Sequence, residues 1–159
     1  MFFFVLLLLV PVVFGAIIIS NKPIDPKDAN LHYITGNALY NIDEYTESIK
    51  HFKQAVNINP DFEEAHNNLA YLYNKAGEYK RAAEHLVKLT ELNPNNPSYH
   101  YDYAINLVMN IKDTKQGKIE EIEEAIKEFE IVESIEPGFL KAKENLEFLK
   151  NMRNEYYSG

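Results

Sequence analysis

Residues 63–94 read EEAHNNLAYLYNKAGEYKRAAEHLVKLTELNP, and much of this stretch recurs elsewhere in the chain at one fixed interval. Asn93-Pro94 follows Asn59-Pro60 by this interval, and Tyr79 follows Tyr45. The histidines form two such series: His32, His66 and His100 in one, and His51 and His85 in the other. A fixed repeat of this length predicts helical hairpins stacked in series, so we expect an all-α solenoid.

Each repeat is predicted to contain two helices. In the second repeat, apolar residues at helical spacing from Ala65 to Tyr73 predict the first helix, and Gly77 permits a tight turn. The second helix is predicted to end at Asn93-Pro94, because proline cannot continue the hydrogen-bond ladder. In the first repeat, Asp25 is predicted to cap the first helix and Asp43 the second.

The repeats define the predicted domain organisation. Residues 1–20 form an apolar segment and 21–28 a linker, and 29–159 form the repeat domain, with repeats at about 29–62, 63–96 and 97–139. The third repeat is longer, because Pro137 follows Pro94 at a wider interval than Pro94 follows Pro60. The surplus near residues 111–119 is interpreted as a surface insertion with an extra helical turn, or as a loop that contributes to partner choice.

Two further helices are predicted after this insertion. An apolar stripe on the first runs from Ile119 to Val132, and its remaining face carries Glu120, Glu121, Glu124 and Glu128, which we interpret as a solvated face. An amphipathic helix over residues 140–157 is predicted to cap the open end of the stack, as terminal repeats require.

This pattern resembles the tetratricopeptide repeat (TPR) family over residues 29–139. The matching residues of the first unit are Gly36, Leu39, Tyr45, Ser48, Phe52, Ala55 and Pro60. Those of the second are Leu69, Ala70, Tyr73, Gly77, Tyr79, Ala82, Leu86 and Pro94. Those of the third are Ala104, Leu107, Ala125, Phe129 and Pro137. The resemblance implies an α-solenoid of three helical hairpins that binds other proteins.

The resemblance also implies a concave groove lined by the first helix of each repeat. The residues it places there are Asn30, Tyr33, Asn37, Tyr40 and Asn41, then Glu64, Asn67, Tyr71, Asn74 and Lys75, then Ser98, Tyr101 and Ile105. Asparagine amides can pair with a peptide backbone, and tyrosine supplies contact area at low rotamer cost. The alternative interpretation is that these residues only solvate a helix face.

Chaperone-binding members of the family hold a partner's C-terminal carboxylates with lysine, arginine and asparagine. Asn37 and Asn68 match the asparagines, but Tyr33 and Ser98 replace lysines and Asp102 replaces the basic residue. An aspartate repels a carboxylate. We therefore expect that this chain does not clamp an acidic chain terminus in that way.

The first twenty residues, MFFFVLLLLVPVVFGAIIIS, carry no charged side chain. As a helix, the apolar run over residues 2–19 spans roughly 27 Å, which is close to the hydrocarbon thickness of a bilayer. We interpret residues 2–19 as a single-pass membrane anchor, with a cleaved secretory signal as the alternative. Lys22 and Lys27 after the run slightly favour a cytoplasmic side for the following domain.

Composition and motifs argue against several function classes. A net charge of -8 argues against nucleic acid as a general partner, and the absence of cysteine excludes disulfides and thiolate metal sites. The periodic histidines are interpreted as packing residues, so neither a metal nor a cofactor is predicted. No nucleophilic, metalloprotease or phosphate-loop motif is present, and we predict that the chain is not an enzyme.

Taken together, these observations predict a membrane-tethered scaffold that binds a peptide segment or protein subunit in its groove. The alternative is an assembly subunit that self-associates through repeat stacking or through its membrane helix. Tethering would raise the effective concentration of partners in the same membrane.

Overall fold

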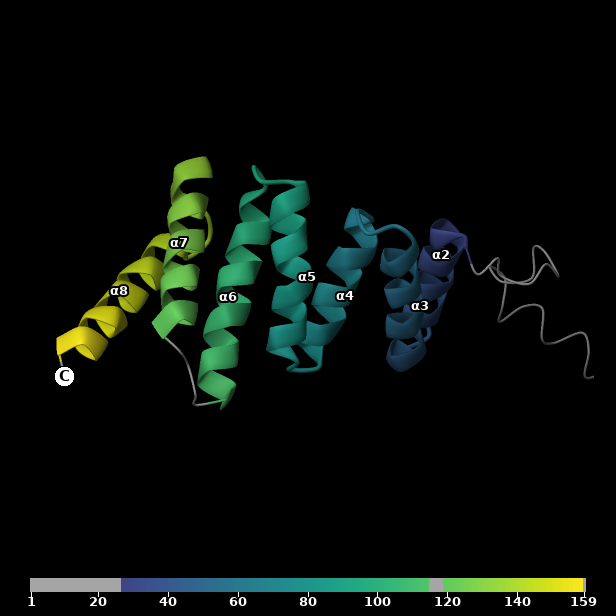
Figure 1. Ribbon diagram of the computed structural model, residues 1–159, viewed down its shortest axis with the longest axis horizontal. Helices are drawn as coiled ribbons and strands as arrows, with labels where there is room; N and C mark the ends of the chain where they lie inside the picture. Colours follow the sequence, from purple (N-terminus) through teal and green to yellow (C-terminus); the bar gives the residue numbers. More distant parts are fainter. Residues whose placement is uncertain (1–26, 115–118, 159) are drawn as a thin grey trace, which may run out of the picture. The chain divides into compact units, whose positions relative to one another are not determined.

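The computed structural model describes residues 27–114 and 119–158. This part of the chain folds as α2 (Ala29–Tyr40), α3 (Tyr45–Ile58), α4 (Glu63–Lys75), α5 (Tyr79–Leu92), α6 (Pro97–Thr114), α7 (Ile119–Ile135) and α8 (Ala142–Ser158), and it contains no strand (Figure 1). The predicted all-α fold is confirmed. The apolar segment 1–20 and most of the linker 21–28 lie outside the described residues.

The chain divides after Phe62 into two compact units, at the point where the second repeat was expected to begin. In the described part, unit 1 contains α2 and α3, and unit 2 contains α4 to α8. Each unit is described by itself below.

Two predictions about helix caps in unit 1 are wrong. The N-cap of α2 is Asp28 and not Asp25, and its Oδ1 accepts a hydrogen bond from the Leu31 amide at 3.0 Å. Asp43 does not cap α3, because Glu44 occupies the N-cap position without a side-chain cap hydrogen bond. Asp43 instead takes a φ of +62°, at the position where the next repeat has Gly77 with a φ of +75°. The turn geometry is therefore repeated, although only one of the two turns uses glycine.

The helices of unit 1 pack closely at Gly36. A Cβ placed on this glycine would lie 2.7 Å from the Phe52 ring, which is 1% exposed. Ser48 Oγ donates a hydrogen bond to the Gly36 carbonyl at 2.8 Å, and Ala55 is fully buried on the same helix as Ser48. The small residue at position 36 thus permits the contact between α2 and α3 that the family resemblance implied.

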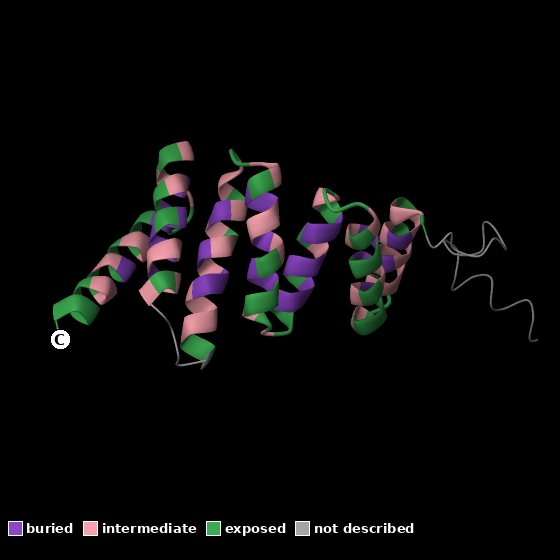
Figure 2. Cartoon of the chain, viewed as in Figure 1, coloured by how far each residue is buried: buried purple, intermediate pink, exposed green. Residues whose placement is uncertain are grey.

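In unit 2, each helix packs against the next from α4 to α8. The main core cluster spans α5 to α8, and its buried members are Ala83, Ala104, Leu107, Ile122, Ala125, Ile126, Phe129, Val132, Ala142 and Leu149. Buried residues recur along one side of each helix, as the sequence periodicity predicted, and Figure 2 shows them in purple. The apolar contacts are therefore made between consecutive helices, as expected for a solenoid.

The insertion predicted near residues 111–119 is partly helical. Residues 111–114 continue α6, which has 18 residues where α4 has 13. The following helix α7 has 17 residues where α5 has 14. Most of the surplus in the third repeat therefore lengthens the two helices of this hairpin, and residues 115–118 lie outside the described part.

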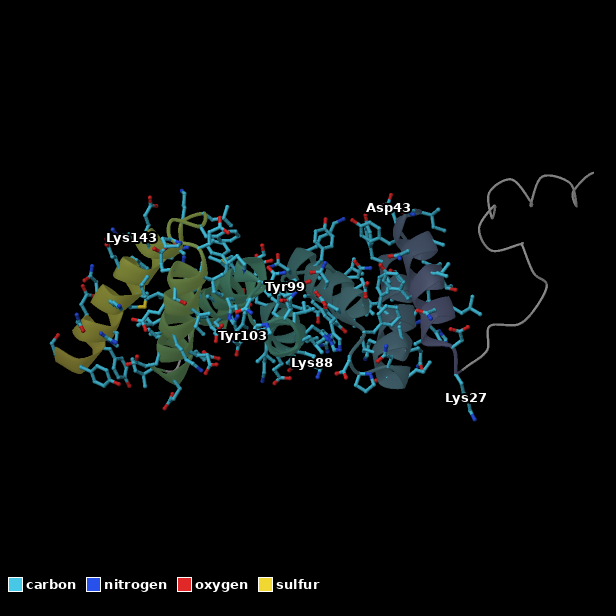
Figure 3. All side chains as sticks on the ribbon, turned by 90° about the horizontal axis from the view of Figure 1, so that it is seen from above. Lys27, Asp43, Lys88, Tyr99, Tyr103 and Lys143 are labelled. Atoms are coloured by element: carbon cyan, nitrogen blue, oxygen red, sulfur yellow. The ribbon has the colours of Figure 1, made fainter. Side chains whose placement is uncertain are left out.

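Helix α8 has the features of a cap. Its Ala142 and Leu149 are buried, and Phe139, Leu146 and Met152 pack against the same cluster. In α8, Lys143 and Glu147 occupy the repeat positions that His100 and Ala104 occupy in α6. Both side chains are exposed. Lys143 is labelled on this helix in Figure 3. In each earlier hairpin, this side of the first helix faces the second helix. In α8 the same side is charged, so it offers no apolar surface to a further helix.

Candidate functional site

In every described hairpin a buried histidine of the first helix pairs with a polar side chain of the second helix. His32 Nδ1 lies 3.1 Å from His51 Nδ1, and His66 Nδ1 lies 3.0 Å from His85 Nδ1. When both rings are neutral, one Nδ1 must donate and the other must accept, so the two rings of a pair hold opposite tautomers. Sequence reasoning identified these histidines as packing residues and missed that they pair. The available signal was the sequence separation between the partners, which is the same in both pairs.

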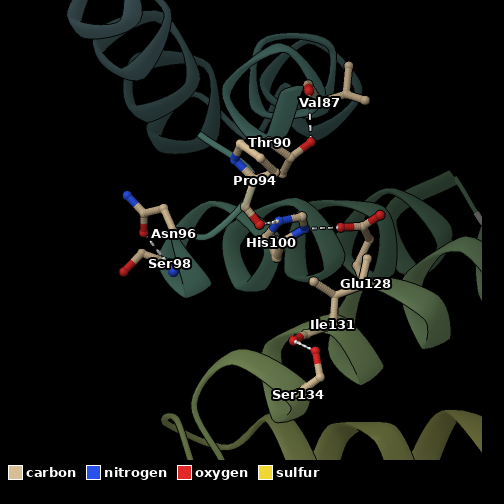
Figure 4. Close-up of polar contacts among 9 residues, drawn as sticks. All are labelled: Val87, Thr90, Pro94, Asn96, Ser98, His100, Glu128, Ile131 and Ser134. Carbon is tan, nitrogen blue, oxygen red and sulfur yellow. Dashed lines mark hydrogen bonds and ion pairs between the residues drawn. The ribbon is translucent and has the colours of Figure 1, made fainter. Parts of the chain in front are cut away.

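The third hairpin replaces the second histidine by a glutamate. His100 Nδ1 lies 2.6 Å from Glu128 Oε2, and His100 Nε2 lies 3.0 Å from the Pro94 carbonyl oxygen (Figure 4). The side chains are 7% and 6% exposed. The prediction that Glu128 belongs to a solvated face is therefore wrong, because its neighbours along the helix could not show that it has a partner on α6.

These pairs do not assemble into a metal centre. Among residues 27–114 and 119–158, no group of three or more histidines, cysteines, aspartates or glutamates could hold a metal ion. A histidine pair supplies only two nitrogen ligands, whereas zinc sites use three or four protein ligands. The pairs instead satisfy polar atoms inside the hairpins, and every buried side-chain nitrogen or oxygen in the described part has a hydrogen-bond partner.

The predicted binding residues fall into two sets, because the chain divides after Phe62. In unit 1, Asn30 is exposed at the start of α2, and Asn41 is its C-cap. The Tyr33 ring contacts Phe62 at a centroid distance of 5.0 Å, and the Tyr40 ring contacts Tyr45 at 5.6 Å. Asn37 lies between these two tyrosines on α2 and is half-buried. Both tyrosines thus have packing roles within unit 1.

In unit 2 hydrogen bonds join α4 to α6, and one of them involves the predicted residue Asn74. Asn74 Nδ2 donates to Asn106 Oδ1 at 2.9 Å, and Tyr99 Oη donates to Glu63 Oε1 at 2.7 Å. These two hydrogen bonds join α4 and α6 directly. Among the other predicted residues on these helices, Ile105 is half-buried. The exposed ones are Glu64, Asn67, Tyr71, Lys75 and Ser98.

Tyr101 has a larger packing role than expected. Its ring lies 5.6 Å from the Phe129 ring and 5.8 Å from the Phe139 ring, measured between centroids. Its hydroxyl accepts a hydrogen bond from Asn145 Nδ2 of α8 at 3.5 Å. The Tyr101 hydroxyl therefore connects α6 to α8, and its ring packs against Phe129 of α7.

Helix α8 supplies surface residues that sequence reasoning missed. Phe148 lies one helical turn after Asn145 and is 54% exposed. It follows Ile105 by the same interval that separates Pro94 from Pro137, so the spacing could have placed it. We call the surface formed by Glu64, Asn67, Tyr71, Asn74, Lys75, Ser98, Tyr101, Asp102, Ile105, Lys141, Glu144, Asn145 and Phe148 the first-helix face of unit 2.

Two tyrosines of α6, Tyr99 and Tyr103, have strongly raised pKa values. Burial, followed by the hydrogen bond to Glu63, raises the pKa of Tyr99 to about 12. Burial also raises the pKa of Tyr103 to about 12, with further contributions from Glu124 and Glu128; both tyrosines are labelled in Figure 3. Ionisation of either phenol is disfavoured at neutral pH, so these groups act as neutral hydrogen-bond donors and not as bases.

A shallow pocket of about 400 Å³ lies elsewhere, between the start of α7 and the end of α8. It is lined by Ile119, Glu120, Glu123, Glu124, Lys127 and Tyr157. Arg153 Nη1 lies 3.5 Å from Glu123 Oε2 and partly neutralises this wall. Its polar lining consists of three glutamates, Lys127 and the Tyr157 hydroxyl.

The described residues contain no helix that is both long enough and apolar enough to cross a bilayer. The predicted anchor at residues 2–19 lies outside that part of the chain.

Comparison with protein families agrees with the hairpin geometry. Residues 36–77 match a family model described as TPR repeat, and residues 63–96 match one described as tetratricopeptide repeat. Residues 36–96 thus carry tetratricopeptide repeats. The second model covers α4 and α5, and the first extends from Gly36 in α2 to Gly77.

Curated proteins with similar sequences include an assembly protein and an organizing protein. The photosystem I assembly protein Ycf3 of Synechococcus is 32% identical over 91 residues, which are 54% of this chain and 53% of that protein. The Hsp70-Hsp90 organizing protein 3 of Arabidopsis thaliana is 27% identical over 130 residues, which are 81% of this chain and 20% of that protein. The chain thus spans about half the length of the first relative and about a fifth of the second.

Two solved structures show the same fold. MamA from Desulfovibrio magneticus superposes with a TM-score of 0.62 at 18% identity, covering 83% of this chain and 70% of that one. The first TPR domain of Spaghetti (RPAP3), bound to the HSP90 peptide SRMEEVD, gives a TM-score of 0.60 at 20% identity, covering 80% and 94%. At these identities the likeness shows the α-solenoid architecture.

Proposed function

We propose that this chain is a tetratricopeptide scaffold that holds a peptide segment or a neighbouring protein subunit on its first helices. The observation that carries the proposal is the first-helix face of unit 2. On this face, exposed Asn67, Tyr71 and Phe148 lie on helices that Asn74–Asn106 and Tyr101–Asn145 hydrogen bonds hold together. Rigid helices that present amide and aromatic side chains are suited to recognition, because little conformational freedom is lost on binding.

The names of the curated relatives support a role in protein assembly. They describe an assembly protein of photosystem I and an organizing protein of Hsp70 and Hsp90. Of this chain we propose only the shared element, which is contact with another protein through the repeats. The carboxylate clamp of chaperone-binding members is not part of the proposal, since Tyr33, Ser98 and Asp102 stand where that clamp has basic residues.

We further propose that residues 2–19 anchor the scaffold as a single-pass segment in the cell membrane, with the repeats on the cytoplasmic side. The support is the uncharged run over residues 2–19 and the two lysines, Lys22 and Lys27, that follow it. A secreted protein released by signal cleavage is the competing outcome. Intact mass of the membrane-extracted protein distinguishes them, because cleavage would remove about 2 kDa from the N-terminus.

Site-specific photo-crosslinking of the full chain in its native membranes tests the binding role. A photoreactive phenylalanine analogue replaces Asn67 on the first-helix face in one sample and Glu84 on α5 in the control, and both positions are exposed. We expect a discrete adduct with a second protein from position 67 and none from position 84. Equal adducts from both positions, or none from either, would contradict the proposal. An adduct between two copies of the chain would favour self-assembly instead.

A further inference from the structure

The first-helix face of unit 2 carries an apolar row. Tyr71 of α4, Ile105 of α6 and Phe148 of α8 occupy equivalent repeat positions, because their spacing is that of the prolines Pro60, Pro94 and Pro137. Tyr71 is 53% exposed and Phe148 is 54% exposed, while Ile105 is half-buried between them in repeat order. Large apolar side chains that lie exposed in one row on neighbouring helices mark an interaction surface more often than isolated ones do.

Acidic side chains lie to one side of this row. Asp102 precedes Ile105 by three residues, Glu144 precedes Phe148 by four, and Glu64 precedes Tyr71 by seven. On an α-helix these intervals place both residues of a pair on one face, with the acid toward the helix N-terminus. Because α4, α6 and α8 are equivalent first helices, the three acids occupy the same side of the row.

These acids have no cationic partner in the described part of the chain, where Glu64, Asp102 and Glu144 make no ion pair. Two lysines share the face. Lys75 lies beyond Tyr71 at the other end of α4. Lys141 lies immediately before α8 and precedes Phe148 by seven residues, as Glu64 precedes Tyr71. The acidic side of the row therefore carries negative charge near Asp102 that no ion pair neutralises. Asp102 lies on α6, the middle helix of the three.

Asp102 is the most informative of these acids. Its side chain reaches solvent, yet the surrounding protein removes enough water to raise the pKa of its carboxyl above the usual value. A partly desolvated carboxylate without a counter-charge gains more from a cation than one in open water does. A lysine or arginine of a bound peptide would supply that cation, and arginine could pair through two hydrogen bonds.

We propose that the first-helix face of unit 2 selects a basic amphipathic peptide segment of its protein partner. Its apolar side chains cover Tyr71, Ile105 and Phe148, and a lysine or arginine pairs with Asp102. This inference rests on the proposed function and names the chemistry of the partner. Asp102 repels an acidic segment. A purely apolar segment leaves the Asp102 carboxylate desolvated without a cation to compensate its charge.

Binding of defined peptides to the full chain in detergent micelles tests the proposal. The probes are fluorescent amphipathic peptides with leucine and phenylalanine at helical spacing. In one probe the polar positions hold arginine and lysine, and in its counterpart of equal length they hold glutamate. Fluorescence anisotropy at two salt concentrations gives both dissociation constants. We expect the basic peptide to bind roughly tenfold or more tightly than the acidic one, with a difference that shrinks as salt rises.

Variants assign the effect to named residues. Asp102→Asn should weaken the basic peptide about threefold to tenfold and leave the acidic peptide unchanged or slightly tighter. Phe148→Ala should weaken the basic peptide by roughly tenfold, because an exposed aromatic side chain is a typical binding hot spot. Glu84→Gln on α5 removes an exposed acid outside the face and should change neither affinity. All three positions are exposed, and circular dichroism verifies that the helices are intact.

The outcomes separate this inference from the proposed function. A preference for the basic peptide that Asp102→Asn and Phe148→Ala reduce, and Glu84→Gln does not, supports it. An acidic preference, no preference, no binding of either peptide, or a basic preference that Asp102→Asn leaves intact overturns it. In each of these four cases, a crosslink from position 67 to a partner in native membranes would still support the proposed function. If that crosslink is also absent, both the inference and the proposed function are wrong.

Discussion

The hairpins α4–α5 and α6–α7 have the same plan but differ in the polar pair at its centre. His66 and His85 meet at 3.0 Å, and both are histidines that can be neutral. His100 and Glu128 meet at 2.6 Å, while His100 Nε2 faces the Pro94 carbonyl, which can only accept. Nε2 therefore carries a hydrogen, and a proton must also lie between Nδ1 and Glu128. Equivalent positions thus hold two histidines in one hairpin and a histidine–glutamate pair that shares a proton in the next.

The three hairpins also share a small residue on the first helix and a large residue on the second helix, at fixed repeat positions. The small residues Ala70 and Ala104 stand where unit 1 has Gly36, and the large residues at the facing positions are Leu86, Phe129 and Phe52 in the same three hairpins. Gly36 pairs with the phenylalanine ring that a Cβ at this position would strike at 2.7 Å. Where alanine replaces the glycine in the second hairpin, leucine replaces the phenylalanine, whereas the third hairpin combines alanine with phenylalanine.

Removing Glu128 is the strongest test of the comparison between the polar pairs. Glu128→Ala should lower the free energy of unfolding of unit 2 by about 3–5 kcal/mol, because it leaves the buried His100 without its charged partner. His85→Ala in the histidine pair should cost only about 1–3 kcal/mol. Urea unfolding of the full chain in detergent, with hydrogen exchange to locate the affected helices, measures both.

The variant Glu128→His sharpens this test. It converts the pair of the third hairpin into the pair of the second, so it should recover most of the stability that Glu128→Ala loses. If Glu128→Ala costs no more than His85→Ala, the two pairs are energetically equivalent and the distinction drawn from their protonation is wrong.

Enlarging Gly36 tests the packing comparison. Gly36→Ala should destabilise unit 1 by about 1–3 kcal/mol, because the new Cβ overlaps the buried Phe52 ring. Combining it with Phe52→Leu reproduces the residue pair of the second hairpin and should restore part of the loss. Hydrogen exchange of α2 and α3 reports the effect. A double variant no more stable than Gly36→Ala would show that the two hairpins pack differently despite their matching positions.

Acidic pH should weaken the histidine pair of unit 1. Burial, and then the charge of His32, lower the pKa of His51, while Glu47 opposes the shift. The unfolded chain therefore binds more protons than the folded one below the ordinary pKa of about 6.5. Stability is fully present above that pH and is lost as pH falls through the lower folded pKa.

Solvent screening at the partly exposed His51 should keep this loss below about 1 kcal/mol. Hydrogen exchange of α3 at neutral and at mildly acidic pH, compared between the natural chain and His51→Gln, measures it. The substituted chain should lose less protection on acidification. An equal loss in both chains would assign the pH dependence to other groups.

The smallest expected effect comes from a surface contact that the third hairpin lacks. Arg81 pairs with Glu78 and lies 5.6 Å from the Tyr73 ring centroid, whereas the equivalent residue of α7 is Glu124. Arg81→Gln should cost at most about 1 kcal/mol, because exposed ion pairs and cation–π contacts are weak. Thermal unfolding at low and high salt checks this, and a loss well above that size would reveal a structural role for Arg81.

Local sequence patterns were sufficient to predict much of the fold. The fixed repeat interval predicted paired helices, Gly77 predicted a tight turn, and apolar spacing predicted the cap formed by α8. Predictions failed where two local signals competed. Asp25-Pro26 resembles a helix start as closely as Asp28 does, and Asp43 resembles a cap although its backbone turns at a φ of +62°. Caps depend on backbone angles of single residues, which composition does not specify.

The candidate surface was harder to predict than the fold. The resemblance placed Glu64, Asn67, Tyr71 and Lys75 on exposed positions of α4, but it missed Phe148, because α8 was interpreted only as a cap. It also counted Tyr101 as a groove residue, although that ring packs against both Phe129 and Phe139. Whether a helical residue faces solvent or a neighbour depends on the next helix, so a single helix pattern leaves that choice open.

By itself, the sequence determined the all-α repeat architecture, because periodic apolar residues must be buried against a neighbouring helix whatever the other residues are. Only the tertiary structure decided which polar side chains are buried together, above all His100 with Glu128 and the histidine pairs of the other hairpins. The physical reason is distance along the chain. Hydrophobic burial follows a local period, whereas a buried hydrogen bond needs two specific atoms from separate helices, far apart in the sequence, to meet within about 3 Å.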